Sequence, residues 1–355
     1  MTTTPVIAPA RPAIKVNGQA APSLTAGLLR LQVHETQDGL FSCEATFGNW
    51  GPDGGRTGFL YFGRDQLEFG KPFAVSLGDG TLFDGRITGL EGTFSDGGPP
   101  EVTVLAEDRF QDMRMTRRTR TFTRQSDEQV IRSIAQDHGL TAQLDISGPT
   151  HVVLAQLNQS DLAFVRERAR ALDAELWMDD RTLHVAAHSR RRGQKTRIGY
   201  GNQLSRFTVL ADLAMQRSSL RVTGWDVAGK RALSEQADDQ SLGAEVGSAD
   251  SGASVLKTAL AERKETVAHA SPRGSAEARA AAEAIYRRGA RRFVRGTGSA
   301  TVDANFRVGA TVTVDGVGPL FSGDYYLAET THLFDGVRGM RCEFVVERPG
   351  LGRPS

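Results

Sequence analysis

The chain has 355 residues, with 43 Lys or Arg, 42 Asp or Glu and a formal net charge of +1. A net charge so close to zero provides no overall attraction to nucleic acid. No apolar stretch approaches the length of a transmembrane helix, about 20 residues. Cys43 and Cys342, the only cysteines, are too few for a disulfide framework or a metal site, and we expect buried free thiols. We therefore expect no membrane insertion, no nucleic-acid specificity and no cofactor.

The chain opens with a β-rich region. Residues 1–12 are rich in Thr and Pro and lack the pattern of a secretory signal, so we expect a flexible N-terminal arm and synthesis in the cytoplasm. Residues 28–33 and 41–47 alternate in polarity around an Asp38-Gly39 turn, which is a good hairpin signal. Residues 13–108 are predicted to form a first antiparallel β-barrel domain.

The pattern changes to mixed helix and strand after Asp108. Ser126 and Gln129 form a predicted capping box for a helix that Gly139 ends. A second helix is expected from about 158–161, where Asn158 or Ser160 can cap and Asp161 complements the helix dipole. A hairpin over 175–185 closes a small α+β domain at 109–190.

The β pattern returns at about residue 200 and is interrupted once. We expect a discontinuous second β-barrel domain over 200–233 and 292–348, followed by a C-terminal tail at 349–355. The interruption at 234–291 is predicted to hold an exposed loop from 234 to about 254 and an Ala-rich helix from 275 to about 288.

The two β regions carry one pattern twice. Residues 73–75, a Gly-rich turn, and Leu82-Phe83-Asp84-Gly85-Arg86-Ile87 match residues 312–314, a turn, and Leu320-Phe321-Ser322-Gly323-Asp324-Tyr325. Each copy ends in a closing strand, at 102–107 or 342–347. Any two hairpins with Gly turns look somewhat alike, but the offset between the copies drifts by only a residue or two, at turns, and this favours a duplication. A duplicated β unit indicates a scaffold and not a catalytic pocket.

A search for catalytic chemistry finds no convincing site. His184 and His188 are four residues apart, but on a strand they would be about 13 Å apart, too far to share an ion. We expect packing or surface roles for both and for His332, no catalytic or metal-binding residue, and no enzymatic activity. Arginine runs at 114–124 and 287–295 could follow phosphates, but a solvated face or a contact to an acidic neighbouring subunit is preferred.

Three motifs, in order along the chain, give a family resemblance. The chain resembles the phage late control D family, the baseplate hub of contractile tails, which also forms the N-terminal part of type VI secretion tip proteins. The resemblance covers nearly all of 13–350. It rests on an Asn-x-Ser-Asp-Leu-x-Phe helix start, a Phe-x-Gly-x-Ile hairpin and a Ser-Gly-x-Tyr strand with a following His. The residues are Asn158, Ser160, Asp161, Leu162 and Phe164; Phe83, Gly85 and Ile87; and Phe321, Gly323, Tyr325 and His332.

The resemblance implies a fold and a set of partners. The fold is mainly β, with two tail-tube-like antiparallel β-barrel domains, a small α+β domain and a helical insertion. The chain would form a homotrimer that adapts a sixfold inner tube above to a threefold spike below, among other baseplate components, in a phage tail or an extracellular contractile injection particle. The spike would be a separate polypeptide, and the signature residues would serve the fold, including helix capping.

Two other functions are weighed against this one. A cell-wall-degrading hydrolase would need carboxylates or histidines that converge in a cleft. A monomeric module that binds glycan or nucleic acid would need an exposed platform of aromatic residues or arginines.

Overall fold

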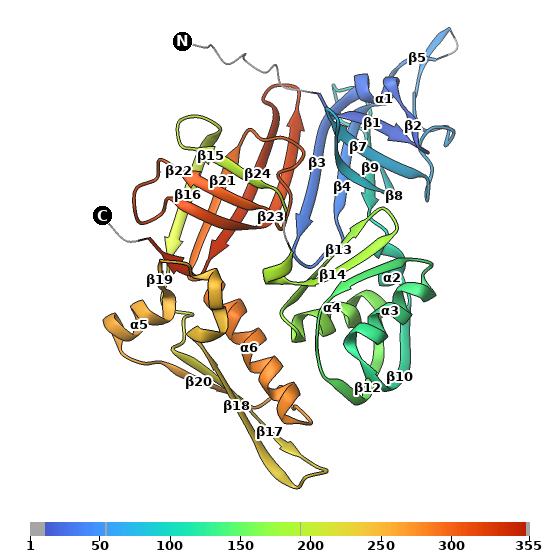
Figure 1. The fold of residues 1–355 in the computed structure, drawn as a ribbon. Coiled ribbons are helices and arrows are strands. Elements are labelled where there is room, and N and C mark those ends of the chain that lie inside the picture. Colours follow the sequence, from blue (N-terminus) through green and yellow to red (C-terminus); the bar gives the residue numbers. More distant parts are fainter. Residues whose placement is uncertain (1–10, 54, 192, 353–355) are drawn as a thin grey trace.

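The computed structural model describes residues 11–53, 55–191 and 193–352, so most of the expected N-terminal arm and the last residues of the expected tail lie outside it. The chain is mainly β, as the sequence predicts, with helices gathered below a large sheet in the view of Figure 1. Among the described helices, none is long and apolar enough to cross a membrane.

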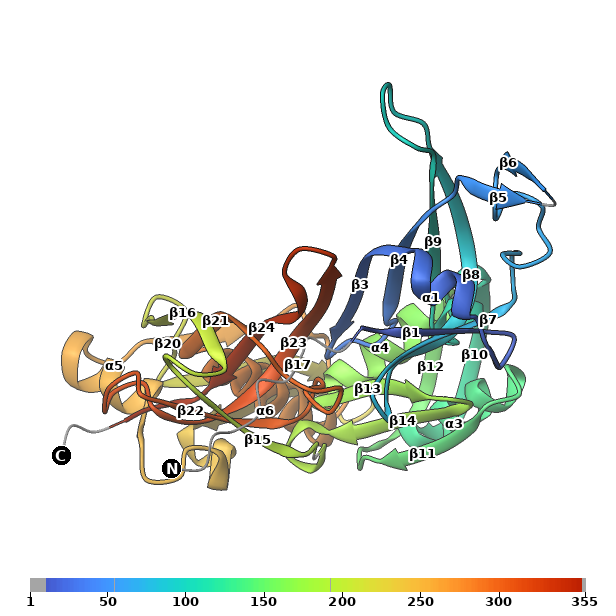
Figure 2. The same cartoon turned by 90° about the horizontal axis from the view of Figure 1, so that it is seen from above.

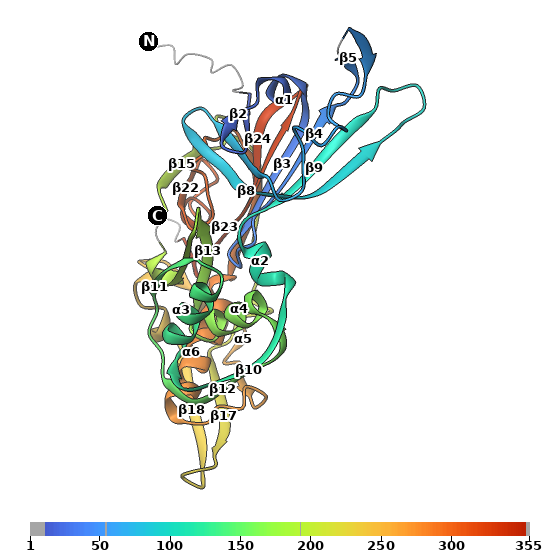
Figure 3. The same ribbon diagram turned by 90° about the vertical axis from the view of Figure 1, so that its right-hand side faces the viewer.

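The first β region has strands β1 to β9. They are β1 (Ala13–Val16), β2 (Gln19–Ala20), β3 (Leu28–Thr36), β4 (Ser42–Gly48), β5 (Gly51–Asp53), β6 (Arg56–Gly58), β7 (Pro72–Leu77), β8 (Gly80–Thr93) and β9 (Glu101–Glu107), with the short helix α1 (Pro22–Gly27). The strands β8 and β9 form a long hairpin that projects beyond the sheet (Figures 2 and 3).

The second β region has six main strands. They are β15 (Lys195–Gly199), β16 (Leu204–Ala211), β21 (Val294–Ala300), β22 (Thr311–Asp315), β23 (Gly323–Asp335) and, closing the region, β24 (Gly339–Arg348). All of their pairings are antiparallel except that of β15 with β22.

Both regions have the same strand order. The first runs β7-β8-β9-β4-β3 and the second β22-β23-β24-β21-β16. Each has a register shift between its equivalent hairpin strands, between Ile87 and Gly89 in β8 and between Leu327 and Glu329 in β23. A second matched shift follows Leu28 in β3 and Leu204 in β16. Because bulges are specific features of a fold, their coincidence supports the predicted duplication.

Two details of the sequence prediction are corrected here. In the strand pairing, Arg86 faces Glu107 and Tyr326 faces Glu347, so the next residues, Ile87 and Leu327, are equivalent. The sequence motif had instead aligned Ile87 with Tyr325. The similar Leu-Phe-x-Gly letters therefore lie two residues out of structural register. The expected closed barrels are not seen among the described strands: β3 pairs with β23, so both regions belong to one 13-stranded sheet.

Between the two regions in the sequence, the chain forms helices and short sheets, a layer that lies below the large sheet in Figure 1. It contains α2 (Phe110–Met115), β10 (Arg117–Ser126), α3 (Asp127–Asp137), β11 (Thr141–Asp145), β12 (Thr150–Ser160), α4 (Asp161–Ala171), β13 (Ala174–Asp179), β14 (Thr182–Ala187) and the 3-10 turn η1 (His188–Arg190). The predicted capping box of α3 is confirmed, with Ser126 and Gln129 each accepting from the other's backbone N–H. Most of the arginine run at 114–124 lies in β10, which pairs with β12.

The insertion differs from its prediction. In place of the loop expected from 234 to 254, the chain forms β18 (Arg231–Asp238), η2 (Asp239–Glu245), β19 (Asp250–Ser251) and the start of α5 (Gly252–Leu260). β18 pairs with β17 (Ser219–Asp226), which pairs in turn with β20 (Lys264–Val267) in a separate sheet. The sequence analysis had placed β17 in the second β region, but β17 belongs to this separate sheet. The Ala-rich helix is confirmed as α6 (Ser275–Arg291), which packs on β17 and β18.

Four clusters of buried side chains form the cores. One lies under each β region, one within the α3/α4 layer, and one between α6 and the β17–β18–β20 sheet. Cys43 and Cys342 are free, as predicted, and are buried in the clusters of the first and the second β region, where burial raises the pKa of both thiols. β25 (Gly350–Leu351) ends the described chain and pairs with β19.

Candidate functional site

The signature helix start is a structural clamp. Ser160 is the N-cap of α4, and its hydroxyl accepts from the Ala163 N–H at 3.2 Å, as capping predicts. Asn158 does not cap: it is exposed, with φ 48°, and its backbone N–H donates to Thr119 Oγ1 at 3.1 Å. Thus only one of the two possible caps is used.

Asp161 is fully buried, and side chains of β10 and of the residue that caps α3 contact it. Its carboxylate is 3.1 Å from Arg118 Nε, 2.7 Å from Arg120 Nη2 and 2.8 Å from His138 Nε2. Burial alone raises the pKa of this carboxyl, but the hydrogen bond from Gln156 and the nearby cations lower it below its usual value. The group therefore stays ionised and holds β10, β12 and α3 against the start of α4.

The other signature residues lie in three separate cores. Leu162 and Phe164 are buried beneath α4, where the Phe164 ring stacks on Phe122 at 5.9 Å. Phe83 and Ile87 are buried under the first β region. A Cβ on Gly85 would lie 2.2 Å from the Glu107 carbonyl oxygen, so only glycine fits there.

The C-terminal motif packs the second β region. The Tyr325 hydroxyl donates to the Phe321 carbonyl at 2.6 Å, and the Arg348 guanidinium lies over its ring at 4.3 Å. Gly323 has φ 128°, which side chains rarely adopt. His332 is buried, with Nε2 3.0 Å from the Phe306 carbonyl oxygen, and burial lowers its pKa to about 4. The motifs thus build three cores and do not converge on one pocket.

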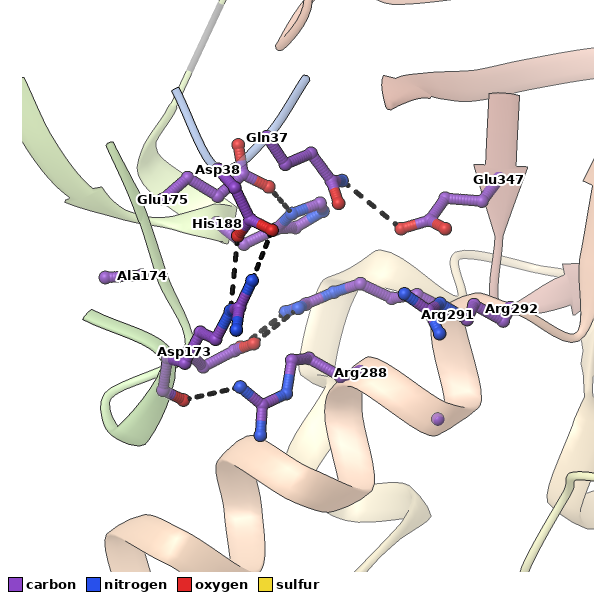
Figure 4. A pocket seen from close by; sticks show the side chains of 12 residues that line it. Gln37, Asp38, Asp173, Ala174, Glu175, His188, Arg288, Arg291, Arg292 and Glu347 are labelled. Atoms are coloured by element: carbon purple, nitrogen blue, oxygen red, sulfur yellow. Dashed lines mark hydrogen bonds and ion pairs between the residues drawn. The ribbon is translucent and has the colours of Figure 1, made fainter. Parts of the chain in front are cut away.

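A hollow lined mostly by charged side chains lies where the β3–β4 turn, the α4 layer, α6 and β24 meet (Figure 4). It has a volume of about 360 Å³. At its base, buried Arg291 of α6 binds both carboxylate oxygens of Asp173 at 2.6 Å and reaches Glu245 at 2.7 Å. Burial opposes the charge of Arg291, but the hydrogen bonds to Glu245 and Asp173 raise its pKa above the usual value.

A second buried carboxylate, Glu175, lies beside this pair. It is 2.6 Å from His188 Nδ1 and 2.9 Å from Arg191 Nη1, and it accepts from the Tyr326 hydroxyl. Although burial raises its pKa, the His188 hydrogen bond and the Arg191 charge bring it below the usual value. Since Arg191 and His188 follow β14 and Tyr326 lies on β23, this network fastens the middle layer to the second β region.

A third network joins the middle layer to α6. His151 of β12 lies between Asp127 Oδ2 at 2.9 Å and Glu277 Oε1 at 2.6 Å, and Arg168 also binds Asp127 at 2.5 Å. The hydrogen bonds to Asp127 and Glu277 raise the pKa of His151 to about 9. Its imidazolium is therefore a tie between α3 and the first turn of α6.

These networks hold elements of the chain against one another. A carboxylate whose pKa is held low by paired cations stays ionised and has no proton to give as a general acid. Among the residues that the structure describes, no group of three or more His, Cys, Asp or Glu could hold a metal ion. The arrangement can fix the relative positions of the parts of the chain.

The comparisons with known proteins agree with this fold. Residues 66–335 match the family model described as the Alg8 N-terminal domain. The chain belongs to the Alg8 N-terminal domain family. No curated protein matches.

Solved structures that share the fold are phage tail proteins and a type VI secretion component. The 43 kDa tail protein of prophage MuSo2 from Shewanella oneidensis superposes with a TM-score of 0.69 at 11% identity, over 96% of this chain and 98% of that one. A tail protein from Neisseria meningitidis MC58 gives 0.66 at 12%, over 97% and 98%. The E. coli c3393 protein, a component of the type VI secretion system, gives 0.58 at 14%, over 96% and 79%. This chain therefore has the fold of phage-tail and type VI secretion components.

Sequence reasoning missed the charged networks of this family member. Arg291 and Asp173 are 118 residues apart, and the only signal was the arginine run at 287–295. That run was expected to face solvent or an acidic neighbouring subunit, but Arg291 is buried against acids of its own chain because α6 folds back onto α4. His188, expected on a strand, begins η1 and is buried against Glu175, while His184 stacks on Trp177 at 5.0 Å.

Proposed function

We propose that this protein is a structural hub subunit of a contractile tail or injection particle. The observation that carries the proposal is the repeated β unit: two regions with one strand order and matched bulges stand side by side in one sheet. A chain with two similar units can present sixfold-like surfaces in a trimer while keeping true threefold symmetry. This suits a homotrimeric ring between a sixfold tube and a threefold spike.

Three further observations support a mechanical role. The superposed tail proteins cover nearly the whole chain. The buried charged side chains at the meeting point of the layers are paired with one another. The signature residues are caps, clamps and core side chains, so we assign them to the fold and none to turnover. In this proposal, the partners are other copies of the chain, the tube protein, the spike and other baseplate components, and the chain acts without catalysis.

The proposed domain division follows the sequence expectation. Residues 13–108 would be the first tube-like unit, 109–190 the α+β domain, and 200–233 with 292–348 the second unit around the insertion at 234–291. The separate sheet of β17, β18 and β20 favours counting 219–233 with the insertion.

Native mass tests the proposal. Light scattering of the purified chain across a concentration series should give three times the 38.3 kDa subunit mass at the upper concentrations. A mass that stays at one subunit at every concentration would contradict the ring and favour a monomeric binding module. Incubation with peptidoglycan should release no soluble fragments, whereas release would favour the hydrolase.

A further inference from the structure

We propose that neighbouring copies join by one specific strand pairing: β16 of one copy adds antiparallel to the outer half of β8, residues 89–93, and to Phe94 of the next. This inference rests on the proposed ring and names the surfaces that would close it. It comes from a contact that each chain already makes within itself.

The internal contact is the pairing of β3 with β23. Its register runs from Glu329 opposite Thr36 to Asp335 opposite Arg30. The side chains on its core face are covered: Val33 is 0% exposed, Leu31 2% and Phe334 7%. The first β unit is thus joined to the second through the outer edge of β3 and the outer half of β23.

The duplication gives each of these two edges an equivalent. The pairs Arg86–Glu107 and Tyr326–Glu347 relate β8 to β23 by 240 residues, from 86 to 326. The pairs Arg30–Thr46 and Arg206–Ser299 relate β3 to β16 by 176 residues, from 30 to 206. Hence β8 of the first unit corresponds to β23, and β16 of the second corresponds to β3.

Both equivalent edges are open in the single chain. Within the described part of the chain, residues 89–93 of β8 pair only with β9, because β7 reaches no further than Arg86. Likewise β16 pairs only with β21 among the described strands. Phe94, the equivalent of Phe334, is 65% exposed where Phe334 is 7% exposed. The same position is bare in one unit and covered in the other.

The internal register fixes the intermolecular one. Transferring it places Phe94 opposite Phe207, Thr93 opposite Thr208 and Gly92 opposite Val209. Phe207 and Val209 are half-buried and pack on the second core, so a neighbouring strand would complete their burial. An aromatic pair across two strands stabilises a sheet. An open strand edge is also a ready template for another chain.

The surroundings of Phe94 support a protein partner. Its ring lies 6.1 Å from Phe59 and 5.9 Å from Phe62, and Trp50 lies 5.2 Å from Phe59. All four rings are between 40% and 65% exposed, and Phe94 directly follows β8 in the projecting hairpin. Exposed aromatic clusters of this kind are typical of interface centres.

A second copy is the occupant that the molecule itself supplies. Each chain carries both halves of the contact, one on each unit, at positions that match an intact contact. Such a head-to-tail contact closes a ring when the rotation between neighbouring copies, repeated a whole number of times, completes one full turn. The register also puts Arg206 opposite Ser95 and next to Asp96, as Arg30 lies opposite Asp335 in the internal contact.

Paired cysteines test the register. Facing residues of antiparallel strands have Cα atoms about 4.5–5.5 Å apart, within the range of a disulfide. The double variant Thr93→Cys/Thr208→Cys should form covalently linked trimers on oxidation, seen on a non-reducing gel. The native Cys43 and Cys342 are buried and should not contribute.

The control shifts one cysteine by three residues. Thr93→Cys/Ser205→Cys puts the thiols about 10 Å apart along the strand and should cross-link at least tenfold more slowly. If light scattering shows a trimer but the 93/208 pair cross-links no faster than the 93/205 pair, the strand pairing is wrong and the ring still stands. If both variants and the natural chain are monomers at every concentration, the ring and the pairing both fail.

Discussion

At the scale of single residues, networks of paired charges join elements that are far apart in the sequence. His151, Asp127, Glu277 and Arg168 join the first turns of two helices from different parts of the chain. Each partner needs the others, because an ionised group that is buried without an opposite charge is strongly destabilising. Their protonation states should therefore appear in the stability of the protein.

The pKa of His151, raised to about 9 from 6.5, predicts a pH dependence. A group whose pKa is higher in the folded state stabilises that state fully below its unfolded pKa, and the contribution is lost as the pH rises through the folded value. His151→Gln should therefore flatten the loss of thermal stability between pH 6.5 and 9.5, by on the order of 2 kcal/mol in the free energy of unfolding. Melting temperatures across this range measure it.

His269 provides the control for this experiment. Its side chain is exposed, so His269→Gln should leave the pH profile of the natural chain unchanged. An unchanged profile in the His151 variant would mean that this imidazole does not carry the charge between Asp127 and Glu277.

At the scale of elements, α6 is fixed at its C-terminal end by ions. Arg291 is 3% exposed and lies in the last turn, where a cation also complements the helix dipole. Arg291→Leu would leave Glu245 without its partner and Asp173 with only Arg287, at 4.0 Å, and breaking a buried pair costs about 3–5 kcal/mol. We expect faster amide hydrogen exchange across α6 and η2, measured by mass spectrometry.

Arg279 is the matched control on the same helix. It pairs with Glu235 at 3.3 Å, but its side chain is 67% exposed, and an exposed pair contributes about 1 kcal/mol or less. Arg279→Leu should leave exchange in α6 unchanged. Equal exchange in the two variants would show that the Arg291 network is not what anchors the helix.

The elements that sequence could predict are those specified locally. The caps of α3 and α4, the Ala-rich α6 and the hairpins at Asp38-Gly39 each depend on residues a few positions apart. Most of the strand β18 was predicted to be a loop, because its sequence is largely polar and its pairing with β17 cannot be read from the sequence. The partners of Arg291 could not be foreseen either, since they lie 46 and 118 residues away and only the tertiary fold brings them together.

The same distinction applies to the duplication. Its existence was readable from two similar hairpins, but its register was not, because the letters Leu-Phe-x-Gly recur two residues out of step with the bulges. Closed barrels were expected because an isolated β unit has to hide its edges. The chain instead covers one edge with its second unit, through the pairing of β3 with β23.

At the scale of the whole molecule, the two open edges lie on different units, so the contact between copies is of the head-to-tail kind. A variant blocked on one edge still has the other edge intact. Val209→Lys puts a charge on the core face of β16 and blocks the β16 edge. Phe94→Lys puts a charge directly after β8 and blocks the β8 edge. Each variant alone should lose the trimer and remain a folded monomer, because both positions are partly or largely exposed in the single chain.

Mixing these two variants gives a result that only a head-to-tail contact predicts. The intact β8 edge of the Val209→Lys chain can receive the intact β16 edge of the Phe94→Lys chain, and both remaining edges are blocked. The mixture should therefore form one-to-one pairs of twice the 38.3 kDa subunit mass and nothing larger, measured by light scattering. In a two-fold contact each copy uses the same surface, and each of the two variants carries a lysine on that surface. Every interface in the mixture would then contain a lysine, and no such pair would form. Monomers in the mixture, beside trimers of the natural chain, would thus reject the head-to-tail contact.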